Sequence, residues 1–254
     1  MSMFKKISII LTVCLLVLGT CASCFASMGG PGEKIRIMCY GDSNTWGFTQ
    51  RPGVKRWPSD VRWPGVLQKE VGKEYTIIEE GLSSRTAGED NYDNGLNEAI
   101  QYELNFNGRP TLMPLIKSHI PLDVVVIMLG TNDIKVRFHK TPAEVTANVE
   151  KLVQMIKLSC DPEKEWYGYG VPKILVIAPV PVMATKNSFA PKNAASRELG
   201  PLFKEMAARN GVEFLDAGEY IKVPGMPDGI HLTAEQHRIL GMAVAAKIKS
   251  MDLH

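Results

Sequence analysis

From about Lys34 onward, the hydrophobic residues of this chain fall into short runs separated by longer segments with a helical period. Short apolar runs of this kind are typical of strands that are buried on both faces of a parallel sheet. The segments between them repeat their apolar residues every three to four positions, which predicts amphipathic helices. The predicted strands lie at 35–40, 75–80, 124–129, 174–178 and 213–215, and the predicted helices at 61–71, 111–119, 142–158, 194–210 and 234–251.

Two of the predicted helices begin with a recognisable capping sequence. Thr141 precedes Pro142 and is followed three residues later by Glu144, and Thr233 is followed three residues later by Gln236. This spacing is typical of a capping box, in the first case with proline at the first helical position. The regular alternation of strands and helices predicts an α/β fold, a three-layer α/β/α sandwich around a doubly wound, five-stranded parallel sheet. We expect one domain over residues 34–254, because no repeat or linker divides it.

The first 26 residues have the pattern of an export signal. Lys5 and Lys6 precede an apolar run at 7–18, and small residues follow up to Ala26. A charged segment, an apolar segment and a small-residue cleavage zone together indicate a secretory signal peptide. We therefore expect cleavage after Ala26, a short linker at 27–33, and a periplasmic or extracellular location.

Two alternatives to a cleaved signal stay open. The apolar run is short for a membrane span of about 20 residues, but an uncleaved anchor helix is the simpler competing interpretation. A lipid anchor on Cys21 is the other, since Leu18-Gly19-Thr20 before it resembles a bacterial lipobox, although threonine directly before the cysteine is a poor match. No later segment is apolar for long enough to predict stable membrane insertion after cleavage.

Composition and charge exclude several classes of protein. The chain has 254 residues, of which 45% are hydrophobic and 22% charged, which excludes a disordered chain. Its 29 basic and 27 acidic residues become 27 of each once Lys5 and Lys6 are removed with the signal. A net charge of zero supplies no global field for nucleic acid, so we expect no nucleic-acid partner. A homo-oligomer stays open.

Cysteine use indicates no disulfide framework. Three of the five cysteines lie within residues 1–26, so only Cys39 and Cys160 remain in the mature chain. An exported protein could pair them, but two cysteines are too few to form a disulfide framework. We expect two free thiols.

Four segments that follow predicted strands are rich in polar residues. Three come directly after the first three strands, and the fourth lies between the last strand and the last helix. They are Gly41-Asp42-Ser43-Asn44, Gly81-Leu82-Ser83-Ser84-Arg85-Thr86, Gly130-Thr131-Asn132-Asp133 and Asp228-Gly229-Ile230-His231. Each segment alone is more typical of a turn than of a site. Ligands bind beyond the carboxyl ends of parallel strands, so these segments should meet at one edge of the sheet. A serine, a histidine, an aspartate and an asparagine there would supply a nucleophile, a base, a group that orients the base, and an oxyanion donor.

These four segments resemble the motif blocks of the SGNH (GDSL) hydrolases, in order and at plausible spacing over residues 35–250. The segments 39–47, 61–67, 78–86 and 122–133 are most similar to the small bacterial arylesterases and related acyltransferases of that family. The resemblance implies a flavodoxin-like fold and a serine nucleophile, Ser43, with Asp228 and His231 as the acid and base. It implies no metal and no organic cofactor.

The resemblance also implies an oxyanion hole, and the chain departs from the family pattern at two positions. The implied donors are the backbone amides of Ser43 and Ser84 and the side-chain amide of Asn132. The second block usually offers a glycine where this chain has Ser84, but a backbone amide survives a change of side chain. The first block often continues with leucine where this chain has Asn44, a position that we do not expect to touch the chemistry.

The activity implied is that of a serine esterase acting on a small ester substrate. We expect hydrolysis of short-chain, acetyl-type esters through an acyl-enzyme, arylesterase-like, with acyl transfer to alcohols as a variant of the last step. A carbohydrate O-acetylesterase is the alternative, favoured by export, because exported enzymes meet polysaccharides. A non-catalytic module that binds acylated glycans is a minor alternative, since candidates for all four roles are intact.

The substrate pocket is less well specified by the sequence. Asp42, Trp46 and Phe48 flank the candidate nucleophile and are candidates for lining a pocket, although Trp46 and Phe48 are equally suited to core packing. With Trp57 and Trp63 they predict a crowded entrance that favours short acyl groups. Other site classes lack their motifs. The chain has no Gly-x-Ser-x-Gly and no dinucleotide or phosphate-binding glycine loop, Tyr92 interrupts a calcium-like loop at 90–95, and the histidines have no zinc spacing.

Overall fold

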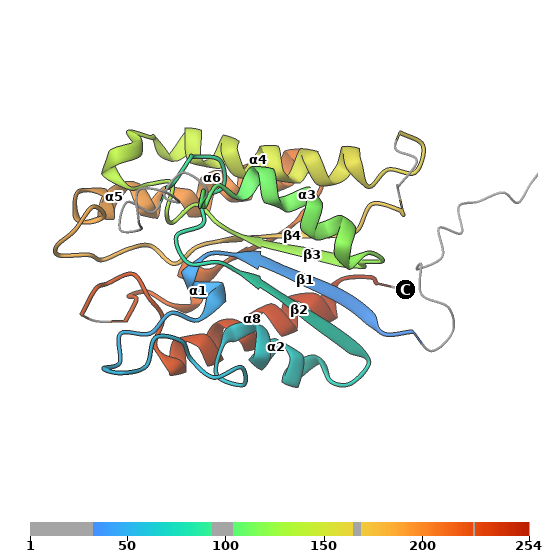
Figure 1. The fold of residues 1–254 in the computed structure, drawn as a ribbon, viewed down its shortest axis with the longest axis horizontal. Coiled ribbons are helices and arrows are strands. Elements are labelled where there is room, and N and C mark those ends of the chain that lie inside the picture. Colours follow the sequence, from blue (N-terminus) through green and yellow to red (C-terminus); the bar gives the residue numbers. More distant parts are fainter. Residues whose placement is uncertain (1–32, 93–103, 165–168, 226, 254) are drawn as a thin grey trace, which may run out of the picture.

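The computed structural model describes residues 33–92, 104–164, 169–225 and 227–253 (Figure 1). Five strands form one parallel sheet in the order β2-β1-β3-β4-β5. This is the flavodoxin-like order of a doubly wound sheet. The strands are β1 (Ile35–Gly41), β2 (Tyr75–Gly81), β3 (Val124–Met128), β4 (Lys173–Ala178) and β5 (Glu213–Asp216), so all five predicted strands are present and each differs from its predicted bounds by one residue.

Helices cover both faces of this sheet, which confirms the predicted three-layer sandwich. In Figure 1, α3 (Gly108–His119), α4 (Pro142–Ser159) and α6 (Leu199–Asn210) lie on one face, and α2 (Trp63–Val71) and α8 (Ala234–Ser250) on the other. Both predicted capping boxes form, at Thr141 with Glu144 and at Thr233 with Gln236. Shorter elements complete the fold: α1 (Ser43–Trp46), η1 (Val136–Phe138), η2 (Ala190–Lys192), α5 (Asn193–Arg197) and α7 (Ala217–Tyr220).

One predicted helix is divided in two. The sequence pattern predicts a single helix at 194–210, but α5 ends at Arg197 and α6 begins at Leu199. Pro201 explains the break, because its ring would clash with the carbonyl of Arg197 in a continuous helix and it has no N–H to donate to it. In the first turn of α6 the missing N–H costs nothing, because the donors there have no partner within the helix.

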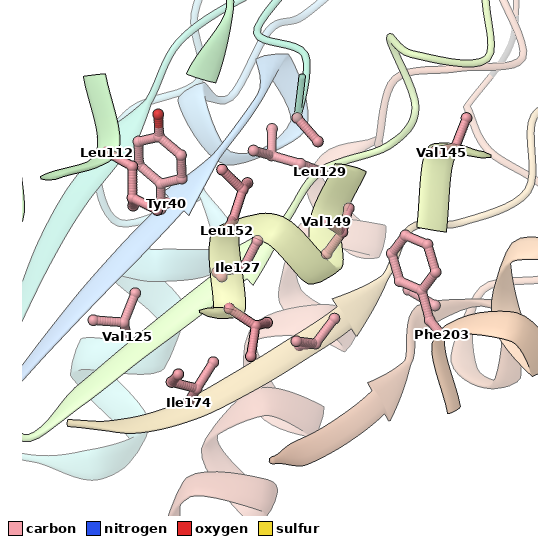
Figure 2. Packing of buried hydrophobic residues seen from close by; sticks show 14 of the residues in the cluster. Tyr40, Leu112, Val125, Ile127, Leu129, Val145, Val149, Leu152, Ile174 and Phe203 are labelled. Atoms are coloured by element: carbon pink, nitrogen blue, oxygen red, sulfur yellow. The ribbon is translucent and has the colours of Figure 1, made fainter. Parts of the chain in front are cut away.

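Each face of the sheet has its own hydrophobic core. Figure 2 shows the core beneath α4 and α6, where side chains of β3 and β4, such as Ile127 and Ile174, meet Leu152 and Phe203 from the helices. The opposite core lies beneath α2 and α8 and includes Trp63, which is 0% exposed. The prediction that Trp63 crowds a pocket entrance is therefore wrong. Cys39 and Cys160 are both buried and both free, as expected.

The predicted export signal at 1–26, and all of the predicted linker except Glu33, lie outside the described residues. Cleavage after Ala26 and lipidation of Cys21 therefore stay predictions. Within the parts of the chain that the structure describes, no helix combines the length and the hydrophobicity that crossing a bilayer requires.

Candidate active site

The register of the sheet brings three of the polar segments to one edge. Gly41 at the end of β1 pairs with Gly81 at the end of β2 and with Met128 at the end of β3. The residues after these strand ends therefore lie side by side. The fourth segment, which contains His231, precedes α8 and reaches the same edge through contacts with α1.

Ser43, His231 and Asp228 form one hydrogen-bonded chain. Ser43 Oγ lies 3.0 Å from His231 Nε2, and His231 Nδ1 lies 2.5 Å from Asp228 Oδ2. The other carboxylate oxygen of Asp228 accepts from the backbone N–H groups of Ile230 and His231, at 2.8 and 3.0 Å. The carboxylate is thus placed to hold Nδ1 as the protonated nitrogen and to leave Nε2 facing the serine.

Local hydrogen bonding also keeps Asp228 charged. Burial alone would raise the pKa of its carboxyl, but the hydrogen bonds from the His231 side chain and from the backbone outweigh burial and hold the pKa below its ordinary value. An ionised Asp228 stabilises a positive imidazole, so His231 can accept a proton from Ser43 at low energetic cost. The ring of Phe48 packs against the imidazole of His231, with 4.3 Å between the two ring centroids.

Ser43 lies at the start of α1, a single helical turn. Asp42 caps this turn, because its carboxylate accepts from the N–H of Asn44 at 2.9 Å, and the turn ends at Gly47 with a left-handed φ of 86°. Asp42 is only 2% exposed, and burial raises the pKa of its carboxyl. The structure thus places Asp42 at the start of the turn, as its cap, and its predicted place in the pocket stays a prediction.

Asn44 connects the nucleophile turn to the histidine loop, a role that the sequence analysis missed. Its side-chain nitrogen donates to the carbonyl of Ile230 at 3.2 Å, and its side-chain oxygen accepts from the N–H of Leu232 at 3.1 Å. These two backbone groups flank His231. No sequence signal could have shown this, because the partners are more than 180 residues apart.

The candidate oxyanion donors lie on two loops that are held together. Asn132 donates from its side-chain amide to the carbonyl of Arg85 at 3.0 Å, and Asp133 accepts from the N–H groups of Ala87 and Gly88. Ser84, on the first of these loops, has a left-handed φ of 68°. That backbone conformation suits glycine, which explains why glycine is the residue usually found at this position of the motif.

Two buried or partly buried cations lie near this edge. Arg85 packs over the Tyr40 ring, donates to the carbonyl of Gly41 at 3.0 Å, and also donates to the carbonyl of Glu80. Burial lowers the pKa of Lys135 to about 8, against the opposing effect of Asp42 and Asp133. Both groups act on the carboxyl of Asp42 and lower its pKa, against the larger effect of burial.

The predicted pocket residues are brought to different environments. Phe48 contacts His231, whereas Trp46 packs against Arg56, whose guanidinium lies 4.8 Å from its ring centroid. Trp57 donates from its indole nitrogen to the carbonyl of Leu232 at 3.3 Å, next to the histidine. Among the described residues, no group of three or more His, Cys, Asp or Glu side chains is arranged to hold a metal ion.

The fold and site define an α/β protein of flavodoxin-like topology in which Ser, His and Asp side chains form a chain of hydrogen bonds at the carboxyl edge of the sheet. Residues 39–239 match the model of the GDSL-like lipase/acylhydrolase family, and the chain belongs to that family.

Solved structures of high similarity agree with this assignment. Est24, a carbohydrate acetylesterase from Sinorhizobium meliloti, is 39% identical, with a TM-score of 0.75 over 85% of this chain and 99% of that chain. The aryl esterase of M. smegmatis is 35% identical, with a TM-score of 0.75 over 86% of this chain and 100% of that chain. These findings confirm that the protein is a carboxylic ester hydrolase.

A curated relative is more distant and longer. An acetylxylan esterase from Xylanibacter ruminicola is 26% identical over 235 residues. The match covers 85% of this chain and 44% of that protein, so the chain spans less than half the length of this relative.

We predict that Asn44→Leu, which introduces the residue common at this position of the motif, will destabilise the fold. It leaves the carbonyl of Ile230 and the N–H of Leu232 without their partner, at a cost of about 1–3 kcal/mol for each buried group. Asn44→Asp keeps the acceptor for Leu232 but places a buried carboxylate against the carbonyl of Ile230, so it should cost at least as much as the leucine variant. Urea denaturation of the three proteins measures this order, and a leucine variant as stable as the parent would contradict it.

Asp133 should give stability a pH dependence of definite sign. Burial raises the pKa of its carboxyl to about 6, outweighing the backbone N–H groups that lower it. Between about pH 4 and pH 6 the folded chain keeps a proton that the unfolded chain releases, so the contribution of Asp133 to stability falls as pH rises through this range.

We therefore predict that the stability advantage of the parent over Asp133→Asn will be greatest near pH 4. It should shrink by about 2 kcal/mol by pH 7, most of the roughly 3 kcal/mol that corresponds to raising a pKa from 3.8 to about 6, because part of the titration lies below pH 4. Urea denaturation of both proteins from pH 4 to pH 7 measures the difference. His237, whose pKa burial lowers to about 3, titrates with the opposite sign but is present in both proteins and cancels. An advantage that grew with pH would show that Asp133 is ionised in the fold.

Proposed function

We propose that the protein hydrolyses esters by nucleophilic catalysis at Ser43. The observation that carries this proposal is the continuous hydrogen-bonded chain from Ser43 through His231 to Asp228. His231 Nε2 takes the hydroxyl proton as Ser43 Oγ attacks the ester carbonyl, and Asp228 stabilises the imidazolium that results.

The next steps return the proton and release the acyl group. The imidazolium gives its proton to the leaving alcohol oxygen as the C–O bond breaks, leaving an acyl group on Ser43. His231 then removes a proton from water, or from a second alcohol, which attacks the acyl-enzyme, and it returns this proton to Ser43 Oγ as the bond between the serine and the acyl group breaks. The backbone amides of Ser43 and Ser84 and the Asn132 side-chain amide stabilise the negative oxygen in both tetrahedral intermediates.

We further propose that the acyl group is short and that the alcohol is a carbohydrate or an aryl group. Two relatives described above are named for acetyl groups on carbohydrates and one for aryl esters. An acetylesterase acting on acetylated glycans and an arylesterase share every step above and differ only in the alcohol that leaves.

We predict that Ser43→Ala will abolish turnover while leaving the fold intact. Loss of the nucleophile of such a triad lowers kcat by about 10⁶-fold. Hydrolysis of p-nitrophenyl acetate measures the rate, and a thermal melt checks the fold. Ser118→Ala, an exposed serine near the end of α3, is the matched control and should keep full activity. A folded Ser43→Ala protein with the parent's activity would refute the mechanism.

Asn132 tests whether its amide serves the reaction or only the loop. One of its two N–H groups already donates to the carbonyl of Arg85, so a structural role accounts for that bond alone. If the second N–H meets the oxyanion, Asn132→Ala should lower kcat by about 10²–10³-fold with little change in KM. Asn132→Asp should be worse, because it places negative charge beside the oxyanion. Steady-state kinetics with thermal melts decide the question, and a lowered Tm with a normal kcat would assign Asn132 to the loop.

A further inference from the structure

The direction in which the leaving alcohol extends follows from the position of His231. Under the proposed function, His231 Nε2 gives a proton to the alcohol oxygen, so this oxygen must come within hydrogen-bond distance of the imidazole. The carbonyl oxygen points instead toward the loops that carry Ser84 and Asn132. The body of the alcohol must therefore extend past His231, away from those two loops.

A hollow of about 320 Å³ has His231 in its wall, and no described residue of the Ser84 and Asn132 loops is among the residues that line it. Its walls come from two segments, the loop that follows α1 and the segment that leads into α8. In Figure 1 the first of these runs in blue from α1 toward α2. The volume is at the lower end of the range for small-molecule sites, about 300–1,000 Å³, and suits a single ring better than an extended chain. The lining residues used below are Thr49, Gln50, Arg51, Trp57 and His231.

The aromatic wall of this hollow is fixed in place. The Trp57 indole nitrogen donates to the carbonyl of Leu232, its backbone N–H donates to Gly47 at 2.8 Å, and its carbonyl accepts from Arg62 at 2.8 Å. The polar edge of the indole is therefore satisfied by the protein. Its ring is held as an apolar surface against which a ring of the substrate can pack without further ordering.

Polar groups with unused hydrogen-bonding capacity stand beside this ring. The guanidinium of Arg51 lies over one face of the Trp57 ring, 5.4 Å from its centroid. Within residues 33–92, 104–164, 169–225 and 227–253, neither Arg51 nor Gln50 makes a side-chain hydrogen bond. Their donors and acceptor are available to a ligand that carries hydroxyl groups, which a plain aryl group lacks.

We propose that this hollow is the subsite for the alcohol half of the ester, and that it selects a sugar ring. The proposal rests on the proposed ester hydrolysis at Ser43. The C–H groups of a pyranose pack on the part of Trp57 that lines the hollow and that Arg51 leaves open, and its free hydroxyls bond to Gln50 and Arg51. The ester-bearing oxygen then lies beside His231.

The test varies the alcohol while the acyl group stays acetyl. The substrates are ethyl acetate, p-nitrophenyl acetate and an acetylated methyl xyloside, and the variants are Trp57→Ala, Trp57→Phe, Arg51→Ala and Gln50→Ala. Tyr169→Ala is the matched control, an exposed aromatic residue in the segment before β4, at the opposite end of the strands. Thermal melts accompany every variant, and Trp57→Phe, which keeps an aromatic face, covers the case in which Trp57→Ala does not fold.

We expect Trp57→Ala to lower kcat/KM for the acetylated xyloside by about 10-fold or more, the effect of losing roughly 1.4 kcal/mol of ring packing. Ethyl acetate, which is too small to reach Trp57, should change less than about 2-fold. Arg51→Ala and Gln50→Ala should lower kcat/KM for the xyloside alone. Lengthening the acyl chain of ethyl esters should give the same ranking in the parent and in Trp57→Ala.

Three results would overturn the proposal. An equal loss on all three acetates would make Trp57 a residue of general structure. A changed ranking of acyl lengths would make the hollow an acyl subsite. A lower kcat/KM for p-nitrophenyl acetate in Trp57→Ala, with no loss on any substrate in Arg51→Ala or Gln50→Ala, would assign the hollow to aryl alcohols.

A failure of the proposed function is distinguishable from these results. If the parent hydrolyses none of the esters, the mechanism fails, but the subsite is still tested by binding. Calorimetry of the acetylated xyloside with Ser43→Ala, and with Ser43→Ala carrying Trp57→Ala, measures occupancy without turnover. Binding that Trp57→Ala weakens supports the subsite, and no binding, or binding that is unchanged, overturns it.

Discussion

The close approach of α1 to the ends of β1 and β2 determines where Ser43 lies, and every later feature of the site depends on it. The approach requires two positions without side chains. A Cβ at Gly41 would overlap the side chain of Thr45, and a Cβ at Gly81 would overlap the backbone of Trp46. Because these glycines are paired in the sheet, the turn that begins at Ser43 can lie directly on the strand ends. The serine is thereby placed directly at the end of the sheet.

The rest of the site is attached to this turn by side chains that bond to backbone groups. Asn44 connects it to the histidine loop, Arg85 connects the strand end before it to the loop after β2, and Asp133 connects that loop to the one after β3. Each of these residues is buried, where an unsatisfied backbone group would be costly. The loops therefore have few alternative arrangements, and the donors that we propose for the oxyanion are held in place by the fold itself. Such preorganisation is what electrostatic stabilisation of a transition state requires.

The sequence was informative where a local pattern determines the structure. The apolar runs predicted all five strands, and the spacing of Thr141 with Glu144 and of Thr233 with Gln236 predicted two helix starts. It was uninformative where the partner is distant. From the sequence alone Trp63 resembles a surface aromatic residue near the first motif, and only the structure shows that α8 covers it. Asn44 likewise has no role in the sequence pattern, and only the structure shows its bonds to the histidine loop. The division of α5 from α6 was local, and Pro201 could have shown it.

In the proposed site, the carbonyl of the ester and its alcohol contact different loops, and these loops differ in burial and in hydrogen bonding. On the side of the proposed oxyanion hole, Arg85, Asn132 and Asp133 are buried and bonded within the protein, so a substitution there alters stability as well as any chemistry. The loop after α1 is more open, and Gln50 and Arg51 lie on it with side chains that the described fold does not use for hydrogen bonds. Because Trp57 is fixed by its own backbone and indole contacts, these neighbours can change without moving the imidazole. Specificity for the alcohol can therefore vary while the hydrogen-bonded chain of Ser43, His231 and Asp228 is retained. This separation explains how one fold can serve esters of unrelated alcohols.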